Sequence, residues 1–307
     1  MVWMILLLLA AAIEPGSATM VLRDGKVESM RVEGFADIAA KRRVTAKTNF
    51  RLASVTKQFT ATAILLLERE GKLQLDDPVS KHLQNWPDYA RAITIRHLLQ
   101  HESGLRPYDD AVPGATPQLS DKDVLTFVQQ QASLFFEPGS GYRYSNTGYA
   151  ILALIVERVS GLRFAEMLKR RIFQPLGMKG TTVGPAKNRA YGHSRTPTGW
   201  KRDDQSPTSA VQGDGGIYSS LHDLAKWTRA LDTCRLLDCV TLQKTWTPSK
   251  FGYGLGWRIA GGVISHTGST RGFRNVIQRH PAKKLTVVIL TNRNEGEPET
   301  AATRLAN

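Results

Sequence analysis

The chain has 307 residues, 41% of them hydrophobic and 22% charged, and a formal net charge of +14. This length allows one large domain or two smaller ones, and the ordinary composition excludes a disordered or low-complexity protein. The positive charge favours anionic surroundings such as nucleic acid, cell-wall polymers or membrane surfaces. Lysine and arginine are spread along the chain, and no nucleic-acid-binding motif accompanies Lys41-Arg42-Arg43, the nearest thing to a cluster. We therefore expect a solvated basic surface suited to an anionic cell envelope, and no nucleic-acid partner.

The first eighteen residues predict an export signal. Residues 4–13 are apolar throughout and too short to span a bilayer comfortably, and Gly16-Ser17-Ala18 provides a small-residue cleavage site. No Lys or Arg precedes the apolar run, so a buried N-terminal helix is the alternative. We expect a periplasmic or extracellular protein, attached to the membrane through this segment if the segment is retained.

Strand patterns follow directly. Residues 19–22 and the stretch from Val27 to about Phe35 predict a β-hairpin with Asp24-Gly25 at its turn. A third short strand at 50–52 leads to a helix that runs from Ser54 to Glu70. That helix is expected to stop at Gly71, which can turn left-handed.

The middle of the chain is mostly helical by its pattern. Helix starts are expected at Asp77-Pro78 and at Thr94, and further helical patterns occupy residues 120–131, 147–160 and 164–173. Ser220-Leu221-His222-Asp223 predicts a capping box for a helix that continues through Leu231.

Strand patterns return near the C-terminus, at residues 253–259, 262–266, 273–279 and 285–291, before a short terminal helix. Strands at both ends with helices between them predict an α/β (α+β) fold. Its antiparallel sheet is built from N- and C-terminal strands, flanked by helices, with an inserted mostly helical domain. The expected divisions are a signal peptide at 1–18, a sheet domain at 19–75 and 212–307, and an inserted helical domain at 76–211.

Cys234 and Cys239 are the only cysteines. No histidine spacing supports a zinc site around them, so they form either a small disulfide loop or two ordinary thiols. No metal or cofactor is expected anywhere in the chain.

Ser54 and Lys57 are the strongest candidates for chemistry. Three residues apart on a helix, they lie one turn apart on the same face, where the lysine amine can reach the serine hydroxyl. A serine hydroxyl becomes a good nucleophile when a neighbour takes its proton, which requires Lys57 to be a neutral amine part of the time. The positive end of the helix would favour negative charge developing beside Ser54. Such pairs also occur by chance on solvated helix faces, although Ser54 is the only serine with a lysine three residues on.

Two more motifs complete the candidate site. Tyr144 and Asn146 lie in a loop after Glu137-Pro138-Gly139-Ser140-Gly141, where a tyrosine oxygen can shuttle a proton and an amide can hold a substrate carbonyl. His266-Thr267-Gly268-Ser269 ends a predicted strand, and Gly268 would let a substrate backbone approach closely. Turn chemistry for the first motif and surface packing for the histidine are the plainer alternatives.

Together these motifs resemble the β-lactamase-related, penicillin-recognising serine hydrolases. That group includes class C β-lactamases, serine DD-carboxypeptidases and family VIII carboxylesterases. The resemblance runs from about Pro15 to the end and includes residues 98–105, Pro175-Leu176-Gly177-Met178 and residues 213–220. It implies a β-lactamase/transpeptidase-like fold.

The resemblance implies a role for each candidate residue. Ser54 would be the acylated nucleophile, Lys57 and Tyr144 the proton-handling pair, and Asn146 a substrate contact. His266, Thr267 and Gly268 correspond to the Lys-Thr-Gly strand motif, and the backbone amides of Ser54 and Ser269 would form the oxyanion hole. Which of Lys57 and Tyr144 is the acylation base stays open.

The expected function is a serine hydrolase that acts through an acyl-enzyme on an amide or ester, with DD-peptidase-like or esterase activity. Its substrate would be a cell-wall peptide, a β-lactam or a small ester. Histidine in place of lysine at position 266 argues against efficient antibiotic hydrolysis. The alternatives are a class C-like β-lactamase and a non-catalytic penicillin-binding or regulatory protein.

Overall fold

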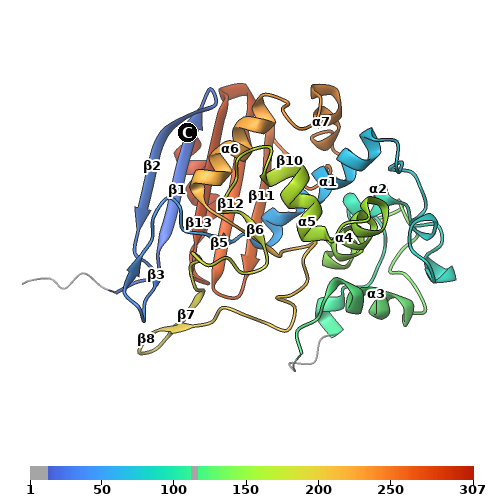
Figure 1. Cartoon of the computed structure of the whole chain (residues 1–307), viewed down its shortest axis with the longest axis horizontal. Coiled ribbons are helices and arrows are strands. Elements are labelled where there is room, and N and C mark those ends of the chain that lie inside the picture. The colour runs from blue at the N-terminus through green and yellow to red at the C-terminus, as the bar shows by residue number, and fades with distance from the viewer. Residues whose placement is uncertain (1–12, 112–116) are drawn as a thin grey trace, which may run out of the picture.

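The computed structural model describes residues 13–111 and 117–307, so nearly all of the apolar segment at residues 4–13 lies outside the described residues. Its centre is a six-stranded sheet in the order β10-β11-β12-β13-β1-β2, with every neighbouring pair antiparallel (Figure 1). The strands are β1 (Ser17–Arg23), β2 (Lys26–Glu33), β10 (Arg258–Ala260), β11 (Val263–Thr270), β12 (Phe273–His280) and β13 (Leu285–Thr291). The predicted fold class, an antiparallel sheet drawn from both ends of the chain, is confirmed.

The N-terminal hairpin also forms as predicted. Arg23 pairs with Lys26, and the turn residues Asp24 and Gly25 have φ values of 49° and 70°. β1 lies between β2 and β13, with Ser17 opposite Thr291 and Ala18 opposite Leu290. A cleavage after Ala18 would therefore remove two paired residues of an interior strand.

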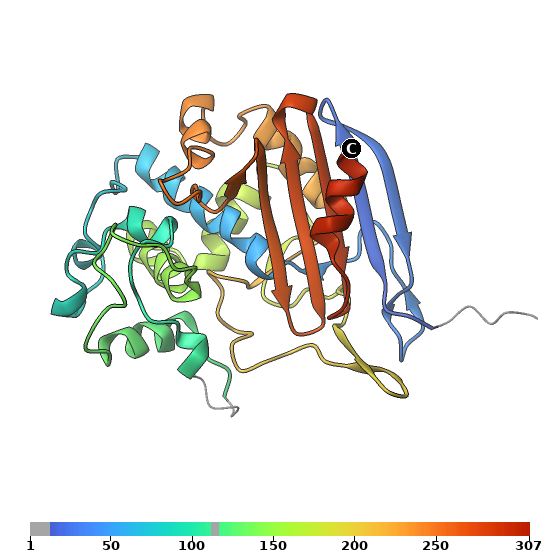
Figure 2. The same cartoon turned by 180° about the vertical axis from the view of Figure 1, so that it is seen from behind.

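Helices cover both faces of the sheet. Figure 2 shows α8 (Pro298–Ala306) on one face, where its Ala302 and Ala306 join a small apolar core with Val287 and Ile289. The opposite face packs against α1 (Lys57–Arg69) and α6 (Leu221–Asp232), as Figure 1 shows. The main hydrophobic core of the protein lies on this side, and Val288 and Leu290 belong to it. Alternate residues of β13 thus serve opposite faces, as the two-residue period of a strand requires.

A mostly helical region packs beside the sheet. Its helices are α2 (Ile95–Leu99), α3 (Asp121–Gln129), α4 (Asn146–Ser160) and α5 (Phe164–Leu168), which continues into a π-helical turn at Lys169–Phe173. Thr94, Ser120 and Ser145 cap three of these helices through their side-chain oxygens. Asp77-Pro78 leads only to a 3₁₀ turn at Val79–Lys81. Within the described ranges, no helix is both long and apolar enough to span a bilayer.

Short strands join the two regions. β5 (Phe50–Arg51), β9 (Ile217–Ser219) and β6 (Thr182–Val183) form one small sheet, and the pairs β3 (Phe35–Asp37) with β4 (Arg42–Arg43) and β7 (His193–Thr196) with β8 (Gly199–Arg202) form two more. Residues 76–211 therefore contain strands as well as helices. After α6, a disulfide joins Cys234 to Cys239 at the start of α7 (Cys239–Thr245), which settles the alternative between a disulfide and two thiols.

Two predicted strand boundaries are wrong. Residues 253–257 form a loop instead of a strand, because Gly256 has a φ of 80° and a Cβ at Gly254 would lie 2.1 Å from the carbonyl oxygen of Thr245. β11 continues through Ser269 to Thr270, so the motif that begins at His266 lies inside a strand and does not end one.

Candidate active site

Ser54 lies in the 3₁₀ turn η1 (Ala53–Thr56), which joins β5 to the start of α1. The preceding residue, Ala53, is buried and has a φ of 49°, a left-handed conformation that is unusual for alanine. The backbone N–H of Leu52 donates to the carbonyl of Ile217 at 2.8 Å, which ties this turn to β9. Ser54 is thereby held, partly exposed, at a sharp junction between a strand and a helix.

Lys57 is fully buried directly behind Ser54. Its Nζ lies 3.2 Å from Oγ of Ser54, 2.9 Å from Oδ1 of Asn146 and 2.8 Å from the carbonyl oxygen of Asp214. A neutral amine in this position can donate its two N–H groups to Asn146 and Asp214 and accept the serine proton on its lone pair. The alternative of a solvated helix face is therefore excluded for this lysine.

Tyr144 lies against the same amine. Its ring centroid is 5.0 Å from Nζ of Lys57, and its hydroxyl is buried with no hydrogen-bond partner among the described residues. A buried hydroxyl without a partner costs free energy unless a ligand or water satisfies it. The hydroxyl is thus available to a bound group.

His266 is completely buried. Its Nδ1 lies 2.6 Å from the carbonyl oxygen of Thr267, so this nitrogen carries the proton, and Nε2 accepts from the hydroxyl of Tyr253 at 2.9 Å. Complete burial, and secondarily the charge of Lys57, lower the pKa of His266 to about 3. The imidazole is therefore neutral at pH 7 with both nitrogens occupied, and its ring centroid lies 6.1 Å from that of Tyr144.

Gly268 lets β11 pack closely against the turn that carries Ser54. A Cβ at this position would lie 2.1 Å from the carbonyl oxygen of Leu52, closer than atoms can approach. The next residue, Ser269, lines a cavity of about 170 Å³ together with Ser54 and Asn146. The structure thus brings all three predicted motifs to one place, with Ser54, Asn146 and Ser269 around the cavity and His266 behind it.

Sequence reasoning missed several residues of this site. Asp214 supplies a carbonyl to Lys57, and its side chain accepts from the hydroxyl of Tyr108 at 2.9 Å. Burial raises the pKa values of both Asp214 and Tyr108. Asp214 lies within the Gly-rich stretch 213–220 of the resemblance, which was the available signal, whereas nothing in the sequence marked Tyr108.

His101 supports the Tyr144 loop. It is buried with a φ of 62°, its Nδ1 accepts from the backbone N–H of Ser145 at 3.1 Å, and its ring centroid lies 4.3 Å from that of Tyr144. Burial lowers its pKa well below the usual value, so the ring is neutral. His101, which lies in the stretch 98–105 of the resemblance, therefore positions the loop that carries Tyr144.

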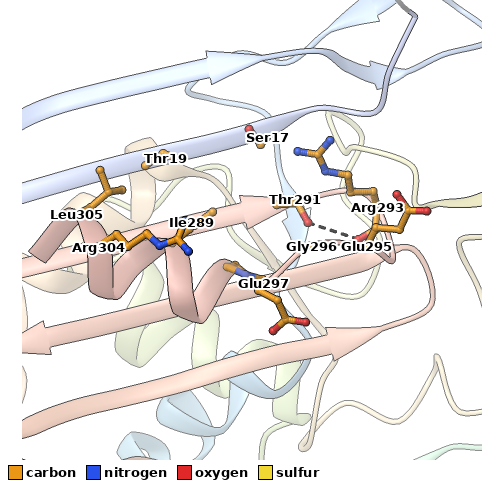
Figure 3. Close-up of a pocket in the computed structure, with 12 residues that line it drawn as sticks. Ser17, Thr19, Ile289, Thr291, Arg293, Glu295, Gly296, Glu297, Arg304 and Leu305 are labelled. Carbon is orange, nitrogen blue, oxygen red and sulfur yellow. Dashed lines mark hydrogen bonds between the residues drawn. The ribbon is translucent and has the colours of Figure 1, made fainter.

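A larger cavity, of about 410 Å³, lies on the outer face of the sheet beside α8 (Figure 3). Ser17, Thr19 and Ile289 line it from the sheet and Arg304 and Leu305 from the helix. Its lining includes none of the predicted site residues. The turn that carries Ser54 leads into α1, which covers the opposite face of the sheet. In residues 13–111 and 117–307, no group of three or more His, Cys, Asp and Glu side chains is placed to hold a metal ion.

A model of the Beta-lactamase family matches residues 8–307. The chain belongs to the β-lactamase family. Within this family, penicillin-binding protein 4* of Bacillus subtilis (strain 168) is 32% identical over 295 residues, covering 85% of this chain and 64% of that protein. The chain therefore spans less than two thirds of the length of that relative.

Solved structures of the β-lactamase family carry the same fold. The octameric penicillin-binding protein homologue from Pyrococcus abyssi superimposes with a TM-score of 0.84 at 28% identity, covering 95% of this chain and 72% of that one. The D-amino acid amidase from Ochrobactrum anthropi SV3, solved with D-phenylalanine, gives a TM-score of 0.78 at 26% identity, covering 91% and 87%. Family members with this fold thus include both penicillin-binding proteins and an amidase.

Proposed function

We propose that the protein is a serine hydrolase that acts through an acyl-enzyme on an amide or ester, with DD-peptidase-like or esterase activity. The observation that carries the proposal is the contact of the buried Lys57 amine with Oγ of Ser54, Oδ1 of Asn146 and the carbonyl of Asp214. The oxygen atoms of Asn146 and Asp214 accept hydrogen bonds from the Lys57 amine and orient it, so that the lone pair of the neutral amine faces the hydroxyl of Ser54. Family membership and the solved amidase support the same chemistry.

In the acylation step, Oγ of Ser54 attacks the substrate carbonyl carbon while its proton passes to Lys57 or Tyr144. The carbonyl oxygen gains the negative charge, and the backbone N–H groups of Ser54 and Ser269 stabilise it. Collapse of this intermediate breaks the C–N or C–O bond, and the leaving amine or alcohol takes a proton from the same pair. Water then hydrolyses the ester on Ser54 and restores the hydroxyl.

His266 bears on the choice among substrates. Its imidazole is neutral and hydrogen-bonded at both nitrogens, so it offers no positive charge to the carboxylate that β-lactam antibiotics carry. This favours a peptidase, amidase or esterase over a class C-like β-lactamase. A binding or regulatory protein that forms a stable adduct without turnover is the second candidate, supported by the similarity to penicillin-binding proteins.

Three probes and one variant test the proposal. The protein is incubated with a p-nitrophenyl ester, a fluorescent penicillin and a chromogenic cephalosporin, each beside Ser54→Ala. We expect ester turnover and acylation of the wild type, and neither with Ser54→Ala. A stable penicillin adduct without turnover of any probe would favour the binding role, and rapid cephalosporin hydrolysis would make the protein a β-lactamase. Ester turnover that survives Ser54→Ala would refute the proposal.

We also propose that the protein is exported and meets an anionic cell envelope. The apolar run at 4–13, the net charge of +14 and the disulfide between Cys234 and Cys239 support this location, because disulfides persist in oxidising compartments. Expression in a Gram-negative host, followed by fractionation and N-terminal sequencing, tests it. We expect to recover the protein from the periplasm, with an N-terminus that lies before Ser17. Recovery only from the cytoplasm, with Cys234 and Cys239 as free thiols, would contradict export.

A further inference from the structure

Two segments that lie far apart in the sequence carry positive charge and no negative charge. Residues 38–49 contain four Lys or Arg residues and residues 185–202 contain five, and neither segment contains an Asp or Glu. The first segment includes Lys41-Arg42-Arg43, and the second includes the hairpin of β7 and β8. The proposed acyl-enzyme chemistry gives neither segment a role.

The fold joins the two segments into one surface, which we call the basic end. The backbone N–H of Asn49 donates to the carbonyl oxygen of Asn188 at 2.9 Å, and Nδ2 of Asn188 donates to the carbonyl oxygen of Lys47 at 3.0 Å. Nη1 of Arg42 donates to Oδ1 of Asn188 at 3.3 Å. The exposed cations of the basic end include Lys41, Arg43, Lys187, Arg195, Lys201 and Arg202.

The carboxylates that flank the two segments do not neutralise this surface. Each of the three already has a partner in the protein: Asp37 accepts from the backbone N–H of Ala40, Asp203 pairs with Arg271, and Asp204 pairs with Arg189. Within residues 13–111 and 117–307, no carboxylate forms an ion pair with Lys41, Lys187 or Lys201. The basic end therefore keeps a net positive charge that faces solvent.

The apolar run at residues 4–13 meets the folded part of the chain at this same end. Glu14 directly follows the run, its carbonyl oxygen accepts from the backbone N–H of Phe35 at 3.0 Å, and its Oε1 lies 3.6 Å from Nη1 of Arg195. Figures 1 and 2 show the hairpin of β7 and β8 projecting from the molecule near β3, which begins at Phe35. A basic surface beside an apolar segment is the combination that binds anionic membranes, because either signal alone gives weak attachment.

We infer that the basic end docks on a membrane surface that contains anionic phospholipids, with cations of both segments against the phosphate groups. A polyanion without a bilayer would match the charge but would not use the adjacent apolar run, so the membrane is the better partner. None of the residues that line the cavity beside Ser54 belongs to the two segments, so the docking surface is separate from the candidate active site. The inference rests on the proposed location at an anionic envelope and adds the surface and the partner to it.

Vesicle flotation tests the inference with a variant that preserves the contacts of the fold. Lys41, Lys187 and Lys201 are exposed, and their replacement by glutamine removes three charges from the basic end. The matched control replaces three exposed lysines elsewhere, namely Lys122, Lys169 and Lys244. The full chain is made by cell-free synthesis under oxidising conditions, which retains residues 1–12 and allows the disulfide to form. Binding is measured with vesicles of phosphatidylcholine alone and of phosphatidylcholine with phosphatidylglycerol, and circular dichroism verifies folding.

Each Lys or Arg near an anionic membrane contributes about fivefold to its affinity. We therefore expect the wild type and the control variant to bind the anionic vesicles at least tenfold more tightly than the neutral ones. The basic-end variant should lose most of that preference, and added salt should weaken it in the wild type.

Three results would overturn the inference. They are a wild type that binds both kinds of vesicle equally, a control variant that loses as much preference as the basic-end variant, and binding to soluble polyphosphate without binding to anionic vesicles. Cell fractionation separates this inference from the proposed location. An exported protein without preference for anionic vesicles would refute the docking surface alone, whereas recovery only from the cytoplasm would refute the location.

Discussion

The amine of Lys57 has three hydrogen-bonding partners. They are Oγ of Ser54, Oδ1 of Asn146 and the carbonyl oxygen of Asp214, all within 3.2 Å of Nζ. Lys57→Ala removes the group that can take the serine proton, and positioned general bases contribute about 10² to 10⁴ in rate. We expect kcat/KM for a p-nitrophenyl ester to fall by at least about two orders of magnitude, measured beside circular dichroism to verify folding.

Lys72→Ala is the matched control for this lysine. Lys72 lies just beyond the end of α1, where it pairs with Glu70 in a partly exposed ion pair. Such pairs contribute little to stability, so this variant should retain wild-type rates. Near-normal activity in Lys57→Ala would show that the buried amine has only a structural role.

Tyr253 supplies the hydrogen-bond partner of Nε2 of His266. Its hydroxyl donates to Nε2 of His266, and Tyr253→Phe would leave that buried nitrogen without a donor. An unsatisfied buried acceptor costs about 1–3 kcal/mol, so urea unfolding should show a loss of that order. Tyr142→Phe, at an exposed ring, serves as control. Equal stability of Tyr253→Phe and wild type would contradict the hydrogen bond.

At the scale of elements, the approach of β11 to η1 sets the width of the cavity. Gly268→Ala places a Cβ 2.1 Å from the carbonyl oxygen of Leu52, so the strand or the turn must move. We expect ester hydrolysis to fall at least tenfold, because a shift of about 1 Å in a reacting group can cost 10²-fold. Ser265→Ala, in the same strand, should retain activity, and unchanged kinetics in Gly268→Ala would show that the close contact is not required.

The elements that sequence reasoning predicted well are those with a strong local signal. The hairpin at Asp24-Gly25, the helix after Ser54 and the helix starts at Thr94 and Ser120 each depend on residues close to one another in the chain. The loop at 253–257 has a strand-like sequence pattern, because aromatic and aliphatic residues alternate there with glycines. Its contacts with Thr245 and Lys57 are tertiary and leave no local pattern.

The same contrast applies to the candidate site. Ser54, Lys57, Tyr144, Asn146 and Ser269 carried recognisable motifs, and the structure brings them around one cavity and the amine behind it. Tyr253 acts through a single contact with a distant residue, His266. Contacts of that kind depend on the folded arrangement of loops, and the residue types alone do not indicate them.

For the whole molecule, buried titrating groups make stability depend on pH in two opposing ways. Burial lowers the pKa of His266 to about 3, so between pH 6.5 and 3 the unfolded chain binds a proton that the folded chain does not. The free energy of unfolding therefore falls as pH decreases through that range, and His101 acts in the same direction. Burial raises the pKa of Asp121 to about 7, so the folded chain holds an extra proton between pH 3.8 and 7, and stability falls as pH increases.

Difference measurements separate these contributions. Urea unfolding of wild type, His266→Gln and Asp121→Asn is followed at several pH values from 4.5 to 7.5. As pH falls below 6.5, the stability advantage of the wild type over His266→Gln should shrink by up to ~1.4 kcal/mol per pH unit. Its advantage over Asp121→Asn should grow as pH falls below 7. Parallel curves for wild type and His266→Gln would mean that His266 has the same pKa in the folded and unfolded chain, which would contradict the effect of its complete burial.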